Sequence, residues 1–371
     1  MIVVLALLAG LLLAYANGSN DNFKGVATLY GSGTTSHRHA LIWATLTTAA
    51  GSLAAVWFAG ELLARFSGKG IVSEELTSQG TFGVAVATSA AITVQLASRL
   101  GIPISTTHAL VGSMVGASAA VQSAVHWQVL GVNVLVPLFF SPIIAIVATA
   151  LVYMLFRNSR MALGVEKETC LCVGCEVIDV LPAAHHSLAV VQASELSVSM
   201  GTRVTCRERY AGRLVGFDAR QLLDTLHFLS AGLVSFARGL NDTPKIAGLM
   251  LLVPAFSSTS AILFCGVAIA LGGIISGRRI AKTLSHAITP MNPGQGFSAN
   301  LVTSFLVIGA TRWGMPVSTT HVSCGALFGI GSVNGQAHWQ VIGRILLAWV
   351  TTLPLAALLA AAILWLLRGT L

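Results

Sequence analysis

Two short segments of this 371-residue chain combine a carboxylate and an amine at the same spacing. Both read Asn-Asp-x-x-Lys, at positions 20–24 and 241–245, and both lie among apolar residues. Charged side chains in apolar surroundings are costly unless they face a partner or a cavity, and inside a membrane they mark functional sites by default. Because the pattern occurs twice, we expect these residues to bind ions or a charged ligand.

Each lysine follows its aspartate by three positions, so the two side chains could share a helix face and form a local ion pair. The pairs are Asp21 with Lys24 and Asp242 with Lys245. Alternatively, the ammoniums face an anion while the carboxylates bind a cation or a proton. Two lysines and two aspartates sum to zero, so a bound anion would favour uptake of a cation or proton at membrane depth.

The asparagines beside these aspartates are further candidate ligands. Asn20 and Asn241 could offer carbonyl oxygens to a hard cation or amide donors to the anion. The candidate cation ligands are Asn20, Asp21, Asn241 and Asp242.

Two segments, at 103–108 and 316–321, read Pro-x-Ser-Thr-Thr-His. Proline suits the first turn of a helix, and hydroxyls after it can cap free N–H groups. A helix N-terminus attracts anions, so two such starts brought together would cradle a tetrahedral oxyanion. The alternative is that the hydroxyls only cap their own helices. The hydroxyl residues are Ser105, Thr106, Thr107, Ser318, Thr319 and Thr320.

Four histidines lie near the predicted helix starts. His108 and His321, which follow the hydroxyl triplets, could shuttle protons, or could be neutral and donate to a backbone carbonyl. His126 and His338 precede tryptophans, which favours anchoring at the membrane interface over catalysis.

The polar segment 157–219 contains cysteines at 170, 172, 175 and 206 and histidines at 185 and 186. This spacing loosely suggests a thiolate metal site, and reduced cytosolic thiols are the alternative reading. A segment of this length is often regulatory or a small folded appendage.

Composition indicates an integral membrane protein. The chain is 55% hydrophobic and only 9% charged, whereas about 25% charge is usual for soluble domains. Many apolar runs approach the ~20 residues of a membrane-spanning helix. The runs are continuous rather than alternating, which favours an all-α fold over strands. The net charge of +8 comes from scattered Lys and Arg, which fits retention on the cytoplasmic side and not nucleic-acid binding.

The apolar pattern predicts helices over residues 1–16, 40–59 and 79–99, one from the segment at 101 to about 121, and one from 126 to about 156. Residues 17–32 are predicted to be a broken or re-entrant continuation of the first helix. A second apolar run, 222–237, is predicted to break at Arg238-Gly239.

The pattern then repeats. The Asn-Asp segments are 221 residues apart, the hydroxyl segments 213, and two His-Trp-Gln-Val segments, from 126 and 338, lie 212 apart. The same motifs in the same order indicate an internal duplication. We therefore expect a first transmembrane repeat at 1–156, a polar loop or appendage at 157–219, and a second repeat at 220–371. Glycine pairs at 112/116 and 325/329 predict close helix approach.

Loop charges predict that the repeats are inverted. The first-half loop spanning 61–75 carries net −1, whereas the matching loop at 278–282 carries +3. Positive loops prefer the cytoplasm, so the two loops are expected on opposite sides of the membrane. Five crossings per half, about ten in all, would place both termini outside and 157–219 inside. Inverted repeats with discontinuous helices are typical of secondary transporters, with the site near the midplane.

These motifs resemble the inorganic phosphate transporter (PiT) family, over residues 1–156 and 220–368. The resemblance rests on Gly-Ser-Asn-Asp at 18–21, Gly-Leu-Asn-Asp at 239–242 and the two Pro-x-Ser-Thr-Thr-His segments. It implies an inverted-repeat fold and cation-coupled phosphate uptake. It also implies that the Asn-Asp pairs bind sodium or phosphate and that the Ser-Thr-Thr triplets bind phosphate.

One departure from the family pattern concerns the coupling ion. The family usually has asparagine three residues after each aspartate, whereas this chain has Lys24 and Lys245. Each ammonium could occupy the place of a sodium ion or contact the anion directly. Some members of the family carry sulfate, so the anion is also open.

We therefore expect a multi-pass protein of the cell (inner or plasma) membrane that moves inorganic phosphate by symport with sodium or protons and alternating access. No cofactor and no nucleic-acid partner are expected, and a homo-oligomer stays open. The alternative is a carrier for another oxyanion such as sulfate. A remote alternative is an intramembrane metalloenzyme or sensor, although no nucleophile–base motif supports an enzyme. The expected substrate-binding residues are Asn20, Asp21, Lys24, Ser105, Thr106, Thr107, Asn241, Asp242, Lys245, Ser318, Thr319 and Thr320.

Overall fold

The computed structural model describes residues 1–67, 70–166, 168–181, 190–202, 210–252 and 255–370. The chain divides into two compact units, one formed by Met1–Tyr153 with His227–Leu371 and the other by Met154–Leu226.

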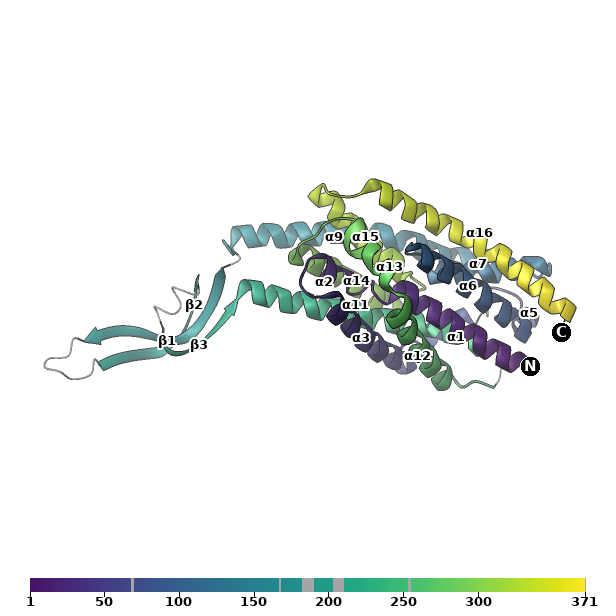
Figure 1. Cartoon of the computed structure of the whole chain (residues 1–371), viewed down its shortest axis with the longest axis horizontal. Coiled ribbons are helices and arrows are strands. Elements are labelled where there is room, and N and C mark those ends of the chain that lie inside the picture. Colours follow the sequence, from purple (N-terminus) through teal and green to yellow (C-terminus); the bar gives the residue numbers. More distant parts are fainter. Residues whose placement is uncertain (68–69, 167, 182–189, 203–209, 253–254, 371) are drawn as a thin grey trace. The chain divides into compact units, whose positions relative to one another are not determined.

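The larger unit is a bundle of helices drawn from both halves of the sequence (Figure 1). The first half contributes α1 (Ile2–Asp21), α2 (Ala27–Gly31), α3 (His37–Phe58), α4 (Gly60–Phe66), α5 (Glu74–Thr77), α6 (Gly80–Leu100), α7 (Thr106–Ala120), α8 (Trp127–Leu130), η1 (Gly131–Leu135) and α9 (Val136–Ala162). The second half contributes α11 (Ala219–Met250), α12 (Ser258–Ser276), α13 (Arg278–Lys282), η2 (Thr283–Ala287), α14 (Pro293–Arg312), α15 (Thr319–Asn334) and α16 (Trp339–Thr370). Helices α9 and α11 extend beyond this unit.

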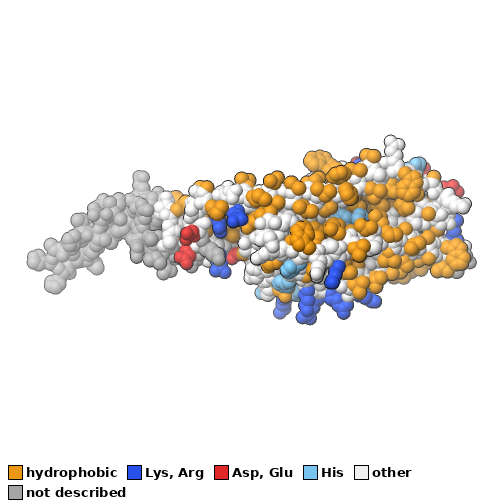
Figure 2. Space-filling view, turned by 90° about the horizontal axis from the view of Figure 1, so that it is seen from above, with side chains coloured by type: hydrophobic (Ala, Val, Ile, Leu, Met, Phe, Trp, Pro, Cys, Tyr) orange, Lys and Arg blue, Asp and Glu red, His pale blue; other side chains and the backbone are white. Residues whose placement is uncertain are grey.

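Six helical stretches among the described residues are long and apolar enough to cross a membrane. They are Ile2–Asp21, His37–Phe58, Gly80–Leu100, Trp127–Ala162, Ser258–Ser276 and Trp339–Arg368. Hydrophobic side chains also cover much of the outer surface, as Figure 2 shows on one face. An exposed apolar surface of this kind is stable in contact with lipid, and the helical prediction is confirmed for this unit.

One predicted helix break is confirmed and the other is wrong. The continuation over 17–32 is broken as predicted, by the turn between α1 and α2. Helix α1 continues through Asn17 to Asp21 and ends only there, before the turn that leads to α2. The break predicted at Arg238-Gly239 is wrong, because α11 runs without interruption from Ala219 to Met250 and includes Pro244. Polar residues alone do not end a helix when its neighbours offer partners for their side chains.

Helices α7 and α15 begin after short non-helical segments, in the same way in both halves. Gly101 and Gly314 adopt left-handed backbone angles, with φ of 72° and 64°, which glycine tolerates without strain. Ser105 and Ser318 then cap the helices by accepting hydrogen bonds from the N–H groups three residues later. The predicted capping by these serines is therefore confirmed, whereas Pro103 and Pro316 lie before the helices and not in their first turns.

Close packing joins helices from opposite halves. A Cβ on Gly116 of α7 would lie 2.0 Å from the carbonyl oxygen of Ala357 in α16. A Cβ on Gly329 of α15 would lie 2.5 Å from the carbonyl oxygen of Ile146 in α9. The predicted close approach at the 112/116 and 325/329 pairs is thus confirmed, and each of these helices packs against a helix of the other half.

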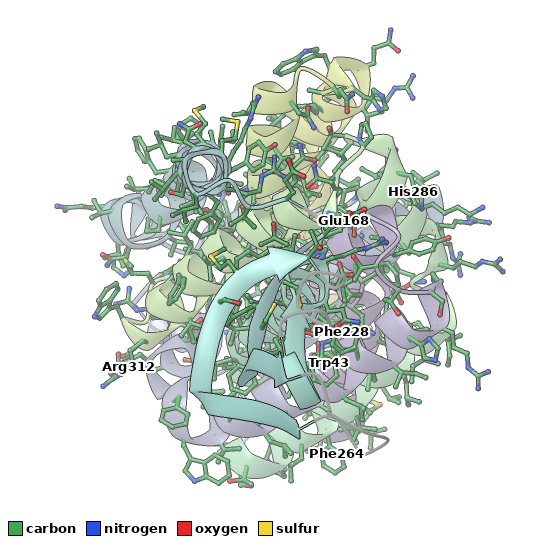
Figure 3. All side chains as sticks on the ribbon, turned by 90° about the vertical axis from the view of Figure 1, so that its left-hand side faces the viewer. Trp43, Glu168, Phe228, Phe264, His286 and Arg312 are labelled. Atoms are coloured by element: carbon green, nitrogen blue, oxygen red, sulfur yellow. The ribbon has the colours of Figure 1, made fainter. Side chains whose placement is uncertain are left out.

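Helices α3 and α11 also pack closely. Trp43 stacks on Phe228 with ring centroids 5.0 Å apart and donates from Nε1 to its carbonyl oxygen at 2.9 Å (Figure 3). A Cβ on Gly239 would lie 2.2 Å from the carbonyl oxygen of Thr48, so α3 directly covers the middle of α11. Beyond Gly239, the hydroxyls of Ser52 in α3 and Thr243 in α11 are hydrogen-bonded at 2.7 Å.

The smaller unit contains β1 (Thr169–Leu181), β2 (Val190–Thr202) and β3 (Tyr210–Asp218), an antiparallel sheet in the order β2-β1-β3. The all-α prediction is therefore wrong for residues 157–219. Cys172 is disulfide-bonded, which removes it as a thiolate ligand, and Cys170 is free and buried. The side chains of Cys175 and Cys206, and both histidines at 185 and 186, lie outside the described residues. The described residues contain no group of three or more His, Cys, Asp or Glu able to hold a metal.

Candidate functional site

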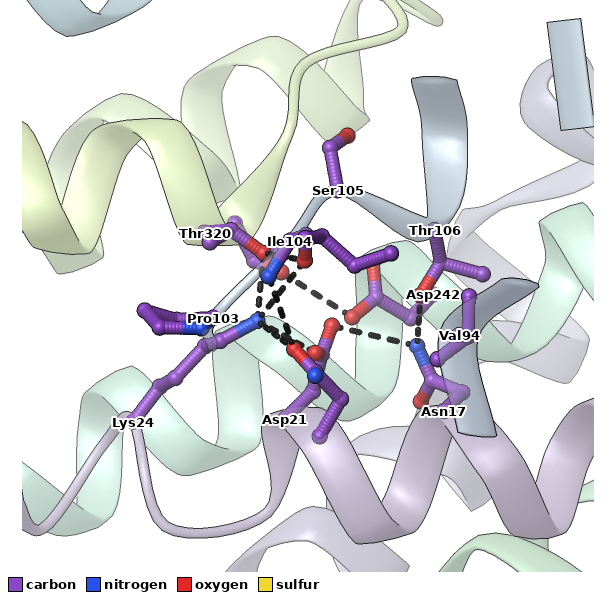
Figure 4. Close-up of polar contacts among 12 residues, drawn as sticks. Asn17, Asp21, Lys24, Val94, Pro103, Ile104, Ser105, Thr106, Asp242 and Thr320 are labelled. Carbon is purple, nitrogen blue, oxygen red and sulfur yellow. Dashed lines mark hydrogen bonds and ion pairs between the residues drawn. The ribbon is translucent and has the colours of Figure 1, made fainter. Parts of the chain in front are cut away.

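The ammonium of Lys24 lies at the centre of a buried polar cluster (Figure 4). Its Nζ forms an ion pair with Asp21 and donates to the hydroxyl of Thr320. It also donates to Asn20 Oδ1 at 3.1 Å and to the carbonyl oxygen of Ile104 at 3.3 Å. Thr320 belongs to the second half of the sequence, so this lysine bridges the two halves.

Lys245, in the second half of the sequence, makes the matching contacts. Its Nζ donates to the carbonyl oxygen of Val317 at 2.6 Å, to Thr107 Oγ1 at 3.1 Å and to Asp242 Oδ1 at 3.4 Å. Thr107 and Thr320 are the third hydroxyls of the two triplets. Each ammonium therefore contacts its own aspartate and the last hydroxyl of the other half's triplet.

The second hydroxyl of each triplet is connected to a carboxylate, directly in one half and through an amide in the other. Thr319 donates to Asp242 Oδ2 at 3.0 Å. On the other side, Asn17 Nδ2 donates to Thr106 Oγ1 at 3.0 Å and to Asp21 Oδ2 at 3.2 Å, so an amide links the pair (Figure 4). The two aspartates interact electrostatically with each other, which places both carboxylates in one cluster.

The model of the phosphate transporter family matches residues 17–360, nearly the whole chain. The chain belongs to the phosphate transporter family. Together with the six apolar helical stretches, this membership makes it a multi-pass membrane protein.

Two bacterial relatives cover the chain almost completely. Both are named "Probable low-affinity inorganic phosphate transporter". The one from Rhizobium meliloti (strain 1021) is 28% identical over 94% of this chain and 91% of its own length. The one from Bacillus subtilis (strain 168) is 27% identical over 97% of this chain and 96% of its own.

A solved structure titled "The sodium-dependent phosphate transporter" has a TM-score of 0.76 and covers 100% of both chains, with 21% sequence identity. This likeness shows that the two proteins share a fold.

In this phosphate transporter family member, the first hydroxyl of each triplet has a structural role. Ser105 Oγ accepts from the N–H of His108 at 3.1 Å, and Ser318 Oγ accepts from the N–H of His321 at 3.2 Å. The capping alternative therefore holds for both serines, whereas the four threonines include the hydroxyls that contact the charged residues.

The asparagines of the Asn-Asp pairs hold neighbouring helices in place. Asn20 Nδ2 donates to Ser98 Oγ and to the carbonyl oxygen of Ile102, both at 3.1 Å. Asn241 Oδ1 accepts from Thr311 Oγ1 at 3.1 Å, and its amide donates to Asp242 Oδ1 at 3.0 Å. Both amides therefore connect α1 or α11 to the helix before a hydroxyl triplet.

All twelve predicted site residues are buried, with at most 5% of any of them exposed. Four further residues of this cluster were not predicted: Asn17, Ser98, Thr311 and Arg238. A signal was available for all four. Ser98 and Thr311 are 213 residues apart, the same separation as the hydroxyl segments. Asn17 and Arg238 are 221 residues apart, the same separation as the Asn-Asp pairs, and each lies four residues before its aspartate.

The two triplet histidines lie beside the cluster and meet each other. The rings of His108 and His321 are 4.5 Å apart, and His321 stacks on Trp349 at 3.9 Å. His321 Nδ1 donates to the carbonyl oxygen of Leu138 at 3.3 Å, which matches the alternative of a backbone-bonded histidine. The shuttle role stays a prediction. The interfacial roles of His126 and His338 also stay predictions.

Proposed function

We propose that the protein moves inorganic phosphate across the membrane by alternating access, with phosphate bound between the two Ser-Thr-Thr segments. One observation carries the proposal: each lysine ammonium contacts the terminal threonine of the other half, Lys24 with Thr320 and Lys245 with Thr107. The proposed site then combines hydroxyls, ammoniums and two helix N-termini, which are groups that bind a tetrahedral oxyanion.

The reciprocal contacts also support two inverted repeats. A rotation that exchanges Lys24 with Lys245 also exchanges Thr107 with Thr320 and the α7–α16 contact with the α15–α9 contact. We propose that α7, α11, α14 and α15, which are shorter or more polar than the six apolar stretches, complete about ten crossings. The proposed repeats are residues 1–156 and 220–371.

On binding, phosphate would replace some of the hydrogen bonds that the side chains of the site make with one another. We infer that phosphate oxygens accept from the ammoniums of Lys24 and Lys245 and from the hydroxyls of Thr106, Thr107, Thr319 and Thr320. Asp21 and Asp242 hold the ammoniums in position before the anion arrives. Burial strengthens these contacts because water does not compete for them.

For the coupling ion, we propose a proton rather than sodium. The oxygens that would bind sodium are those of Asn20, Asp21, Asn241 and Asp242, and three of these four residues accept directly from an ammonium. Each lysine thus occupies a place where a mobile cation would lie. The sodium dependence named for the structural relative belongs to that protein.

The test is uptake of labelled phosphate into proteoliposomes of the purified protein, with protein-free liposomes as the control. We expect uptake that arsenate inhibits and sulfate does not, and that an inward proton gradient increases. Competition by sulfate as strong as by phosphate would favour the general oxyanion carrier. A plasma-membrane location is part of the proposal, and fractionation of expressing cells tests it. An enzymatic or sensor role would require bound metal in the purified protein.

A further inference from the structure

Arg238 changes the charge of the proposed phosphate site. Among the described residues, the buried carboxylate, ammonium and guanidinium side chains number five. They are Asp21, Lys24, Arg238, Asp242 and Lys245. Three of them are cations and two are anions, so the cluster carries a net charge of +1, whereas the lysines and aspartates alone sum to zero.

The guanidinium belongs to the same cluster. Arg238 lies four residues before Asp242 on α11, so both side chains share a helix face. It is 2% exposed and interacts electrostatically with both Asp242 and Asp21. Its Nη2 donates to Asn22 Oδ1 at 3.3 Å, one residue after Asp21. The guanidinium from the second half therefore reaches the aspartate segment of the first half.

Arg238 differs from both lysines in its contacts with carboxylates. Lys24 and Lys245 pair with Asp21 and Asp242, whereas Arg238 has no carboxylate oxygen within 4.0 Å among the described residues. Its Nε and Nη1 are buried without a hydrogen-bond partner in the same set of residues. An arginine does not lose its proton in a protein, so this charge is permanent.

The two halves differ at this position. The first-half counterpart is Asn17, a neutral residue whose amide donates to Asp21 at 3.2 Å. Within the paired segments 17–24 and 238–245, Arg238 is the one charged residue without a charged counterpart in the other half. A buried charge without compensation is costly, and a guanidinium with free N–H groups is well shaped to bind an oxyanion.

We propose that Arg238 makes the site selective for a singly charged tetrahedral oxyanion, dihydrogen phosphate, over a doubly charged one such as sulfate. This inference rests on the proposed transport of phosphate. A bound monoanion brings the net charge of the cluster to zero. Hydration free energy scales with the square of the charge, so a dianion loses about four times as much of it on burial as a monoanion does. Its attraction to the cluster is only about twice as large.

Hydrogen phosphate bound together with one proton gives the same net charge, because the two together have the composition of dihydrogen phosphate. No sodium ion is needed to neutralise either complex. His108 and His321 lie next to the cluster, and His321 interacts with both lysines. The net charge of +1 takes both imidazoles as neutral and both carboxylates as ionised. Phosphate and sulfate must therefore be compared at one pH, where these four groups start from the same protonation states for both anions.

The experiment is calorimetric binding of sodium phosphate and sodium sulfate to the purified full-length protein, at a pH well below the second pKa of phosphate. We expect sulfate to bind at least about tenfold more weakly than phosphate. Arg238→Gln should weaken phosphate binding at least about tenfold and reduce the preference over sulfate. Arg238→Lys keeps the charge and should keep the preference. Arg312→Gln removes an exposed arginine of α14 and should behave as the unchanged protein.

Equal affinity for both anions in the unchanged protein, or an unchanged preference in Arg238→Gln, would overturn the inference. A purely structural role would lower the folded fraction without altering the ratio of the two affinities. If Arg238→Gln does not fold, the pH dependence of binding to the unchanged protein is the test. Its affinity for phosphate should fall as pH rises and the fraction of phosphate present as monoanion falls. This fall should exceed any change in its affinity for sulfate over the same pH range. If phosphate binds to neither the unchanged protein nor Arg238→Lys, the proposed function itself is wrong.

Discussion

The ammonium of Lys245 donates a hydrogen bond of 3.1 Å to the hydroxyl of Thr107, a residue 138 positions earlier in the chain. Its counterpart, Lys24, contacts Thr320 in the opposite direction along the sequence. The two contacts tie the start of α7 to α11 and the start of α15 to the turn that follows α1. A substrate held here would touch both halves at once, which is what a transporter needs to couple binding to their relative motion.

Replacing Asp242 by asparagine should abolish phosphate uptake. The substitution keeps the shape but leaves the buried ammonium of Lys245 without its carboxylate, and breaking a buried ion pair costs about 3–5 kcal/mol. Asp21→Asn should have the same effect through Lys24. Proteoliposome uptake measures both variants. Glu75→Gln, an exposed carboxylate before α6, is the matched control and should transport normally. Normal uptake by Asp242→Asn would remove the carboxylates from the mechanism.

Replacing Lys24 by asparagine should make uptake depend on sodium. The change frees Asn20 Oδ1 and Asp21 Oδ1, both of which accept from the ammonium, and creates a pair of oxygens suited to a hard cation. Uptake measured with sodium or with choline as the external cation tests this. If the variant transports phosphate but stays indifferent to sodium, the ammonium does not stand in place of the ion.

Replacing Thr320 by valine should raise the KM for phosphate by about tenfold, the loss of roughly one hydrogen bond to a charged group. Thr107→Val is the equivalent change in the other half and should behave alike. Ser318→Ala is the contrast, because this hydroxyl caps α15 and its loss should cost about 1 kcal/mol of stability. An unchanged KM in both threonine variants would exclude these hydroxyls from phosphate binding.

Replacing Gly116 by alanine should lower the thermal stability of the protein in detergent. The new Cβ would lie 2.0 Å from the carbonyl oxygen of Ala357, so α7 and α16 must separate, at a cost of about 1–3 kcal/mol. Gly343→Ala is the control within α16, because its Cβ would meet nothing within 4 Å. That variant should be neutral or slightly more stable. A melting temperature for Gly116→Ala equal to that of the control would contradict the close packing.

Local sequence was sufficient for much of the fold and site. Charged residues are rare in an apolar chain, so the repeated Asp-Lys pairs stood out, and membrane burial makes such residues costly unless they function. The helix starts at Ser105 and Ser318 were also predictable, because capping depends on residues only three positions apart. The strands in 157–219 were missed because the argument against strands applied to the apolar runs and not to this polar segment.

The continuity of α11 and the role of Arg238 depended on tertiary packing. A polar residue after an apolar run reads as a break, but α3 covers α11 at Gly239 and the helix continues. The number of crossings and the orientation in the membrane stay predictions. By itself, the sequence determined which side chains carry charge and that they occur in two matched sets, because composition and repetition are properties of the chain. Only the tertiary structure decided that Lys24 meets Thr320 and that Arg238 has no anionic partner in the described part of the chain, because contacts between residues far apart in the chain depend on how the helices pack.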